Sequence, residues 1–224
     1  MISDWRANWA NLSGTNPLFP FGFVVLSTWD DTANTTCGNN PPEDCPVAQV
    51  RWGQTAGVGY VPNEALPNTF FAIAFDYGDA TSPFSDIHPR YKQQVAARLA
   101  NAGLAQAYGQ TERYWSGPIA STATSNGTAV TITFESNGAS GLYIKNTNYV
   151  HFEVENSSGD WIAVPIVGNT ASTVTLGFTG QASTVRYNWY TAPCEPVVGP
   201  LLCAVYSAAE ELPAMSFVMN ITAE

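Results

Sequence analysis

The sequence predicts a chain of two parts, an α/β part over residues 1–110 followed by an antiparallel β-sandwich over residues 111–224. Before residue 110, two near-continuous apolar runs are typical of strands buried on both faces of a parallel sheet. After residue 111, short runs alternate apolar and polar residues and recur about every ten residues, the pattern of an antiparallel sandwich. The change from one pattern to the other places the domain boundary near residue 110.

The two apolar runs are FPFGFVVLST at residues 19–28 and NTFFAIAFD at residues 68–76. Each ends in polar residues, where α/β folds place their sites. Between them, DDTANTTCGNNPPEDCP at residues 30–46 has the small, polar and proline residues of a long loop. Two strands are too few for a stable open parallel sheet, which generally has about four to six. We therefore expect the α/β part to be incomplete.

A helix is predicted from Pro89 to Tyr108, because proline fits the first helical position and Gly109 provides a stop. Apolar residues at helical spacing would bury one face of this helix (Val95, Leu99 and Ala102). In the second part, the alternating runs predict strands at residues 129–135, 149–155, 161–167, 172–178, 184–190 and 216–221.

Composition narrows the classes of partner. Eighteen acidic residues against eight basic ones give a net charge of −10, which disfavours nucleic acids and anionic membrane surfaces. The sequence contains no apolar run long enough for a membrane span. Its first residues, MISDWRANWANLS, do not resemble a secretion signal, so any such signal is expected to lie outside this chain.

Four cysteines form two close pairs, Cys37 with Cys45 and Cys194 with Cys203. Neither pair has the spacing or the histidine neighbours of a zinc site, so we predict two local disulfides and no metal. Five Asn-x-Ser/Thr sequences provide candidate glycosylation sites at Asn11, Asn34, Asn126, Asn156 and Asn220. Together these features favour a secreted or lysosomal protein.

The segment SPFSDIHPRYKQQVAARLA contains the strongest candidate for catalysis, His88. It follows a buried strand by a loop that contains Asp76, Asp79 and Asp86, and it precedes the proline that begins the predicted helix. A histidine base oriented by a carboxylate is the arrangement used for acyl transfer. The alternative is that His88 caps the helix and that Asp86 interacts with the helix dipole.

No nucleophile is predicted in the chain. A Gly-x-Ser-x-Gly turn is absent from the sequence, and Gly53-Gln54-Thr55 imitates a Gly-Gln-Ser block but is expected in a helix or loop. Ser82 and Ser85 are explained by turn chemistry. We assign no role to His151, which is expected on the polar face of a sandwich strand.

Several segments together resemble the sialate O-acetylesterase family over essentially the whole chain. They are ISDWR, FPFGFVVLS, VRWGQTAGVGYVPNEALPNTF, SPFSDIHPRYKQQVAARLA with its following AYG, and VRYNWYTAPCE. They match the carboxy-terminal portion of that family. The resemblance implies an SGNH-type serine esterase that removes O-acetyl groups from sialic acids, in lysosomes or outside the cell, without a metal or cofactor.

The resemblance places the family's catalytic histidine at His88. The wider SGNH pattern has an aspartate three residues before the histidine, but position 85 is Ser here. Asp86 is therefore the candidate orienting acid, and Asp79 is its substitute. The family's Gly-Gln-Ser-Asn nucleophile block and its oxyanion-hole donors precede the region that begins at Met1.

We therefore expect residues 1–110 to be the end of an SGNH-type catalytic domain that needs its amino-terminal half as a partner, and the isolated chain to be inactive. Three origins stay open: a truncated sequence, one subunit of a processed enzyme, or a short paralogue without catalysis. The alternative functions are a non-catalytic carbohydrate-binding or interaction protein built on the β-sandwich, and an esterase for another acetylated polysaccharide such as xylan.

Overall fold

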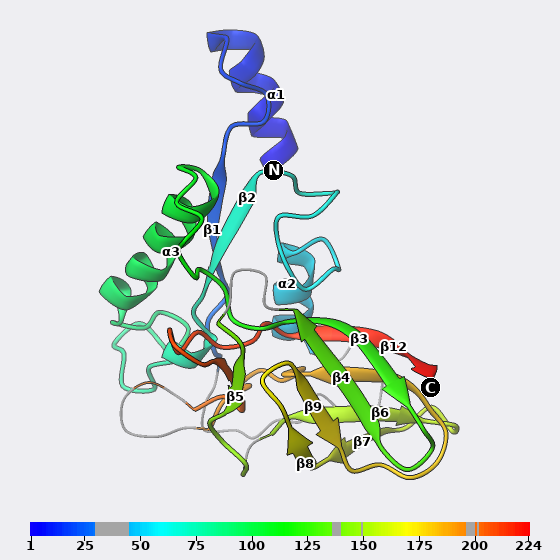
Figure 1. Ribbon diagram of the computed structural model, residues 1–224. Helices are drawn as coiled ribbons and strands as arrows, with labels where there is room; N and C mark the ends of the chain where they lie inside the picture. Colours follow the sequence, from blue (N-terminus) through cyan, green and yellow to red (C-terminus); the bar gives the residue numbers. More distant parts are fainter. Residues whose placement is uncertain (30–44, 136–139, 149, 196–199, 201) are drawn as a thin grey trace.

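The computed structural model describes residues 1–29, 45–135, 140–148, 150–195, 200 and 202–224 (Figure 1). In these residues a small parallel sheet flanked by helices lies beside a large rolled β-sheet. The protein is thus mostly β-sheet with few helices. Cys37 and Asn34 lie outside the described residues.

The small sheet has two strands, β1 (Phe21–Val25) and β2 (Thr69–Ile73). They pair in parallel, with Phe21 opposite Thr69 and Val25 opposite Ile73. Both lie inside the apolar runs that predict them, but each spans only five residues. The polar end of the second run turns instead into a short 3-10 helix, η2 (Phe75–Tyr77), which brings Asp76 next to the end of β2.

Helix α3 (Lys92–Gln106) packs against this sheet. It begins at Lys92, with Tyr91 at the N-cap position, so the predicted start at Pro89 is wrong. The reason is that the preceding residues are held in turns, in which the amide of His88 donates to the carbonyl of Ser85 at 2.9 Å. His88 therefore does not cap the helix.

Two further helices hold the ends of the strands. Helix α1 (Ile2–Ser13) extends from one end of the small sheet (Figure 1), and its buried Arg6 donates to the carbonyls of Phe19 and Asn68 at 2.7 and 3.0 Å. Helix α2 (Pro46–Gln54) lies on the side of the sheet away from α3 (Figure 1).

The second part is one eight-stranded sheet rather than two packed sheets. Its strand order is β7-β6-β10-β12-β3-β4-β9-β8. The bounds, in chain order, are β3 (Ile119–Ser125), β4 (Val130–Glu135), β6 (Phe152–Asn156), β7 (Trp161–Val164), β8 (Ile166–Asn169), β9 (Thr173–Leu176), β10 (Ala182–Tyr187) and β12 (Phe217–Ala223). A separate ribbon pairs β5 (Leu142–Ile144) with β11 (Val205–Ser207).

Strands β7 and β8 show why the sheet rolls up. They stand at opposite ends of the strand order, yet only Pro165 separates them in the chain. The two edges of the sheet must therefore approach each other, which gives a near-barrel around one apolar core. Proline interrupts the predicted strand at residues 161–167 because it lacks an N–H to donate.

The prediction of a purely antiparallel sandwich is also wrong in one pairing. The last strand, β12, lies between β10 and β3 and runs parallel to β3. Alternating polarity shows which residues face the core, but it carries no information about strand direction. β3 itself was not predicted, since its sequence IASTATS is small and polar.

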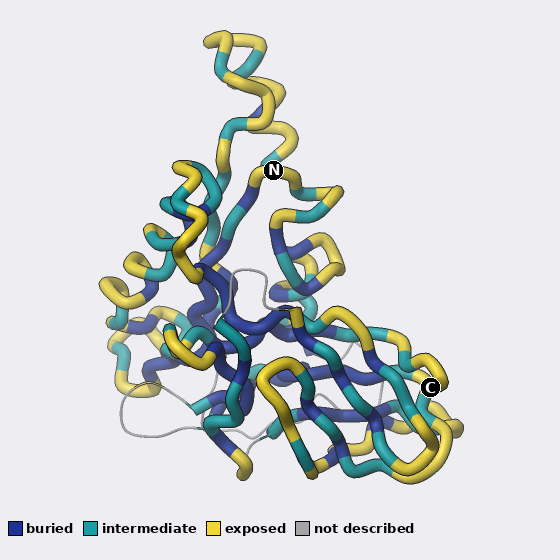
Figure 2. The backbone as a smooth tube through the Cα atoms, viewed as in Figure 1, coloured by how far each residue is buried: buried dark blue, intermediate teal, exposed yellow. Residues whose placement is uncertain are grey.

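A second core joins the two parts of the chain. Val25, Phe71 and Phe75 from the first part pack with Cys194, Cys203, Tyr206 and Met215 from the second. The buried positions accordingly continue from the small sheet into the large one (Figure 2). Buried Arg51 adds polar links across the same junction, donating to the carbonyls of Ser27 at 2.8 Å and Tyr190 at 2.7 Å. This continuous core fixes the α3 side of the molecule relative to the β5–β11 ribbon.

Candidate active site

His88 lies on the loop between η2 and α3, and it is exposed. The loop holds its backbone on both sides, since the His88 amide donates to Ser85 O and the His88 carbonyl accepts from Ser82 Oγ at 2.8 Å. No residue in the described ranges forms a hydrogen bond or ion pair with the imidazole ring. The imidazole is therefore presented to solvent from a backbone of defined shape.

Asp79 and Arg90 close the two ends of this loop. The Arg90 Nε donates to Asp79 Oδ2 at 2.7 Å, its Nη2 to Oδ1 at 2.9 Å, and its backbone amide to Oδ2 at 3.1 Å. The hydrogen bonds from Arg90 hold the pKa of the Asp79 carboxyl well below its usual range. The Asp79 carboxylate is thus paired with Arg90, and no hydrogen bond joins it to His88 in the described residues.

Asp86 is buried within the same loop. Its Oδ1 accepts from the Ser85 hydroxyl at 3.1 Å and from the Ile87 amide at 2.9 Å, and its carbonyl accepts from the Asp79 amide at 3.3 Å. These bonds fix the residues immediately before His88. The carboxylate of Asp86 therefore acts on the backbone that carries the imidazole.

Asp76, the third carboxylate near His88 in the sequence, belongs to another pair. Arg98 of α3 donates to Asp76 through Nη1 and Nη2 at 2.6 and 2.7 Å, and its Nη1 also donates to Ile73 O at 2.8 Å. Burial opposes the charge of Arg98, but Asp76 outweighs that effect and raises the pKa of Arg98. This pair fastens α3 to the end of β2.

The hydroxyl groups considered as nucleophiles are engaged in local structure. Thr55 is fully buried, and its Oγ1 donates to Trp52 O and accepts from the Gly59 amide, both at 2.9 Å. Ser82 and Ser85 bond within the loop, as described above. These contacts explain each hydroxyl by turn structure, in agreement with the interpretation from sequence.

His151 is not on a strand face, because β6 begins at Phe152. Its ring is half-buried, stacks on Tyr190 with centroids 4.1 Å apart, and lies 2.7 Å from the carbonyl of Pro193 through Nδ1. Burial lowers the pKa of His151. Its environment is that of a packing residue.

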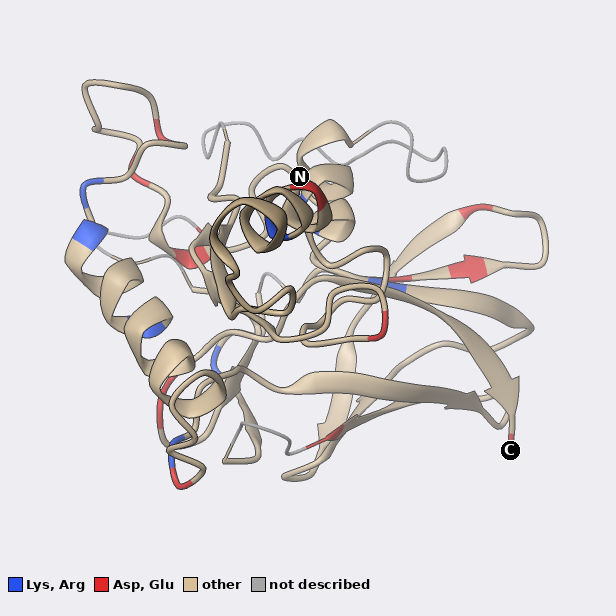
Figure 3. Ribbon diagram, turned by 90° about the horizontal axis from the view of Figure 1, so that it is seen from above, with Lys and Arg blue, Asp and Glu red and all other residues tan. Residues whose placement is uncertain are grey.

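Two cavities line the N-terminal half of α3. One, of about 500 Å³, lies between Asp79 and the first turn of the helix. The other, of about 550 Å³, lies between α3 and the β5–β11 ribbon. Gln94 lines both cavities, so they are neighbours along α3, and we call the two together the trough. Charged groups of both signs gather around this part of α3 (Figure 3).

The remaining predicted residues lie away from this trough. Cys194 and Cys203 form a disulfide inside the second core, whereas Cys37, the expected partner of Cys45, lies outside the described residues. Among the candidate glycosylation sites, Asn11, Asn126 and Asn220 are exposed and Asn156 is half-buried, and Asn34 is not described.

Within the described ranges, no group of three or more His, Cys, Asp or Glu residues is placed to hold a metal ion. Nor does any helix in those ranges have the length and apolar character needed to cross a membrane.

Sequence reasoning missed the basic and aromatic residues of the trough. Arg90 and Tyr91 stand next to the predicted motif, and the HPRY sequence could have suggested them. Arg98 lies in the helix predicted after this motif, but nothing in its local sequence distinguishes it from a solvent-exposed arginine. Lys145 and Tyr206 come from the distant ribbon, and no local signal in the sequence links them to His88.

Comparison with known proteins gives three findings. Residues 119–221 match the family described as the sialate O-acetylesterase C-terminal domain. The sialate O-acetylesterases of Mus musculus and Homo sapiens are 35% and 34% identical to this chain over 99% of its length. The chain spans 40% of the length of the mouse protein and 41% of the length of the human one.

The third finding is a likeness in fold. The crystal structure of a carbohydrate acetylesterase from Xanthomonas citri superposes with a TM-score of 0.73 at 24% sequence identity. The match covers 98% of this chain and 44% of that one. Both parts of the described fold therefore occur together within a larger protein.

Proposed function

Because this chain is related over 99% of its length to the carboxy-terminal portion of sialate O-acetylesterases, we propose that it is the part of a carbohydrate O-acetylesterase that carries the catalytic base. The observation that carries this proposal is the placement of His88. His88 is exposed on a loop whose ends, Asp79 and Arg90, line a cavity, and the backbone around it is fixed by Asp79, Arg90 and Asp86.

In the proposed reaction, His88 takes the proton of a serine hydroxyl as that oxygen attacks the acetyl carbonyl. The imidazolium then gives the proton to the departing sugar oxygen, which leaves an acetyl-enzyme. In the second half, His88 takes a proton from water as the water attacks the acetyl group, and returns it to the serine oxygen when acetate leaves. Asp86 contributes by holding the amide of Ile87, which directly precedes His88.

We further propose that the serine and its oxyanion-hole donors lie outside these 224 residues, in a segment that completes an SGNH-like domain with residues 1–110. Two features support this. A two-stranded parallel sheet is smaller than stable open sheets usually are, and Val24 of β1 and Trp5 and Trp9 of α1 are 39%, 45% and 52% exposed. Apolar surface of this kind is typical of a covered face. Residues 111–224 then form the second domain.

Acetate release tests the proposal directly. The chain, joined to the proposed serine-bearing segment, is expected to release acetate from O-acetylated sialic acid, and His88→Ala is expected to lower kcat about 10² to 10⁴-fold. The matched control is His151→Asn, because asparagine tolerates the positive φ of 49° at that position and keeps a donor for Pro193. Unchanged release from the His88→Ala enzyme would exclude His88 as the base.

The substrate and the compartment are part of the same proposal. Release of acetate from O-acetylated sialic acid but not from acetylated xylan would support the sialate assignment. The reverse result would instead support an acetylated plant polysaccharide as the substrate.

Expression through a secretory pathway should attach glycans at the exposed Asn11, Asn126 and Asn220, detected as a mass decrease after glycosidase treatment. Absence of that decrease would contradict a secreted or lysosomal glycoprotein.

A further inference from the structure

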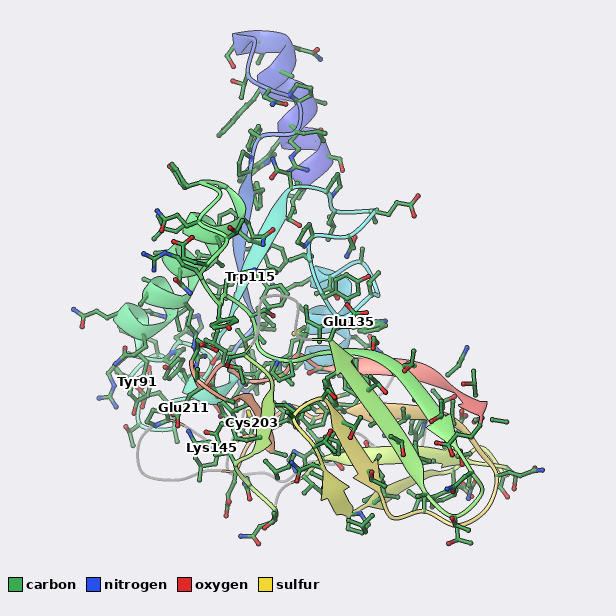
Figure 4. All side chains as sticks on the ribbon, viewed as in Figure 1. Tyr91, Trp115, Glu135, Lys145, Cys203 and Glu211 are labelled. Carbon is green, nitrogen blue, oxygen red and sulfur yellow. A yellow bond between two sulfur atoms is a disulfide. The ribbon has the colours of Figure 1, made fainter. Side chains whose placement is uncertain are left out.

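The cavity of about 550 Å³ between α3 and the β5–β11 ribbon has the composition of a binding site. Its walls come from both parts of the chain. Arg98 and Gln94 project from α3, Tyr77 from η2, and Lys145, Tyr206 and Glu211 from the ribbon and the turn after it. Tyr91, Lys145 and Glu211 lie together on this side of the molecule (Figure 4).

The two cations of the cavity are already neutralised. Arg98 is paired with Asp76, and Lys145 Nζ lies 2.9 Å from Glu211 Oε2. The lysine hydrogen bond lowers the pKa of Glu211, so this carboxylate stays ionised at neutral pH. With Glu210 also lining the wall, the cavity holds three carboxylates against two cations. An anionic ligand would gain no net attraction there.

A neutral ligand rich in hydroxyl groups fits these groups better. The Glu211 side chain is 61% exposed, and it accepts from Tyr143 Oη at 3.1 Å as well as from Lys145. Each carboxylate oxygen has two lone pairs, so Glu211 can also accept from a ligand hydroxyl. Lys145 has further N–H groups to donate, and its Nζ lies over the Tyr206 ring, 4.7 Å from the centroid.

This cavity neighbours the one that is lined by Asp79 and Arg90, the residues at the two ends of the His88 loop. Gln94 lines both this cavity and the one next to Asp79. Tyr91 lines the latter, and its ring packs on Tyr77 of the former with centroids 5.6 Å apart. A glycan that runs from the His88 loop along α3 would pass Tyr91 and Gln94 before it reaches this cavity.

We propose that this cavity binds a neutral hexopyranose, the sugar next to the one that bears the acetyl group. The choice of a sugar rests on the proposed esterase function, whereas the choice of a neutral one rests on the paired charges. Under this proposal the carboxy-terminal part of the chain contributes directly to glycan recognition, through Lys145, Tyr206 and Glu211.

Titration of the 224-residue chain tests the proposal by amide chemical shifts in NMR. Lactose is expected to give saturable shifts at residues 143–145 and 206–212, and free N-acetylneuraminic acid is expected to bind there at least about tenfold more weakly. Glu211→Gln should weaken lactose binding about tenfold, the loss that corresponds to one hydrogen bond to a charged group. Lys145→Met, which removes the ammonium group but keeps an unbranched side chain, should have a similar effect.

Glu135→Gln is the matched control, because Glu135 is exposed on β4 and does not line the cavity. It should bind lactose as the natural chain does. The proposal is overturned if lactose causes no saturable shifts at these residues, if the acidic sugar binds more tightly, or if Glu211→Gln binds with unchanged affinity while its spectrum remains that of a folded chain. Binding needs no nucleophile, so this result is independent of the acetate-release test of the proposed function.

Discussion

Asp79 accepts hydrogen bonds from both the guanidinium and the backbone amide of Arg90, with its Oδ2 2.7 Å from Nε and 3.1 Å from N. The two residues are eleven positions apart and lie on either side of the His88 loop. A carboxylate with a charged fork and an amide as partners is well placed to hold a loop in one shape. We therefore expect Asp79 to hold the loop that carries His88 in position.

Asp79→Asn should loosen this loop. An amide side chain has only one acceptor oxygen, so it cannot accept from all of the Arg90 donors at once. We expect faster hydrogen exchange in a peptide that covers residues 79–90, measured by mass spectrometry, with unchanged exchange in the strands of the rolled sheet. Asp160→Asn, at an exposed aspartate, is the control. Equal exchange in the natural chain and the Asp79→Asn chain would refute the positioning role.

The same carboxylate should contribute to acid sensitivity. Arg90 lowers the pKa of Asp79 in the folded chain, whereas an unfolded aspartate has a pKa of about 3.9. The stabilisation is therefore fully present above about pH 3.9 and is lost as the pH falls towards the folded pKa. Urea unfolding between pH 7 and pH 2 should show a smaller acid-dependent loss of stability in Asp79→Asn than in the natural chain. Parallel curves for the two proteins would contradict this.

Gly22→Ala should destabilise the packing between the small sheet and α3. A β-carbon at Gly22 would lie 2.3 Å from Cε2 of Phe70, so the phenyl ring would have to move. Overpacking of this kind costs about 1 to 3 kcal/mol, measurable as the change in the free energy of unfolding in urea. Phe70→Leu in the same chain should recover part of the loss.

Gly53→Ala provides the matched control for this prediction. Apart from its chain neighbours and the backbone of its own helix, no atom of the described residues lies within 4 Å of the added carbon, and Gly53 lies in α2. Alanine is the better helix former by about 0.5 to 1 kcal/mol, so this variant should be more stable. A greater stability of Gly22→Ala than of the natural chain would show that Phe70 does not restrict the site.

Arg51→Met should weaken the junction between the two parts of the chain and lower the free energy of unfolding. Burial lowers the pKa of Arg51 to about 9, and the side chain is fully buried. Its guanidinium donates to four backbone carbonyls, those of Leu26, Ser27, Tyr190 and Thr191. Leaving buried acceptors without donors should cost about 3 to 5 kcal/mol in urea unfolding. Arg113→Met, at an exposed arginine, should cost far less, and equal effects would contradict a special role for Arg51.

Local sequence patterns predicted most strands because the signal for each lies within the strand itself. The apolar run NTFFAIAFD contains β2, and alternation in AVTITFE contains β4. Strand β3 was not predicted because its residues are small and polar. The start of α3 was predicted too early because Pro89 is compatible with a helix start and also with a turn. Strand direction and the rolling of the sheet could not be predicted, since they depend on pairings such as that of β12 with β3.

The sequence by itself determined the similarity to sialate O-acetylesterases and predicted the two-part organisation and the candidate base His88, because each depends on residues that are neighbours in the chain. Only the tertiary structure decided the partners of the carboxylates: Asp79 with Arg90, and Asp76 with Arg98. It also decided that Lys145 and Glu211 of the ribbon face α3. The physical reason is that hydrogen bonds and ion pairs act over a few ångströms in space, and the continuous core that brings these residues together is formed only by the whole described fold.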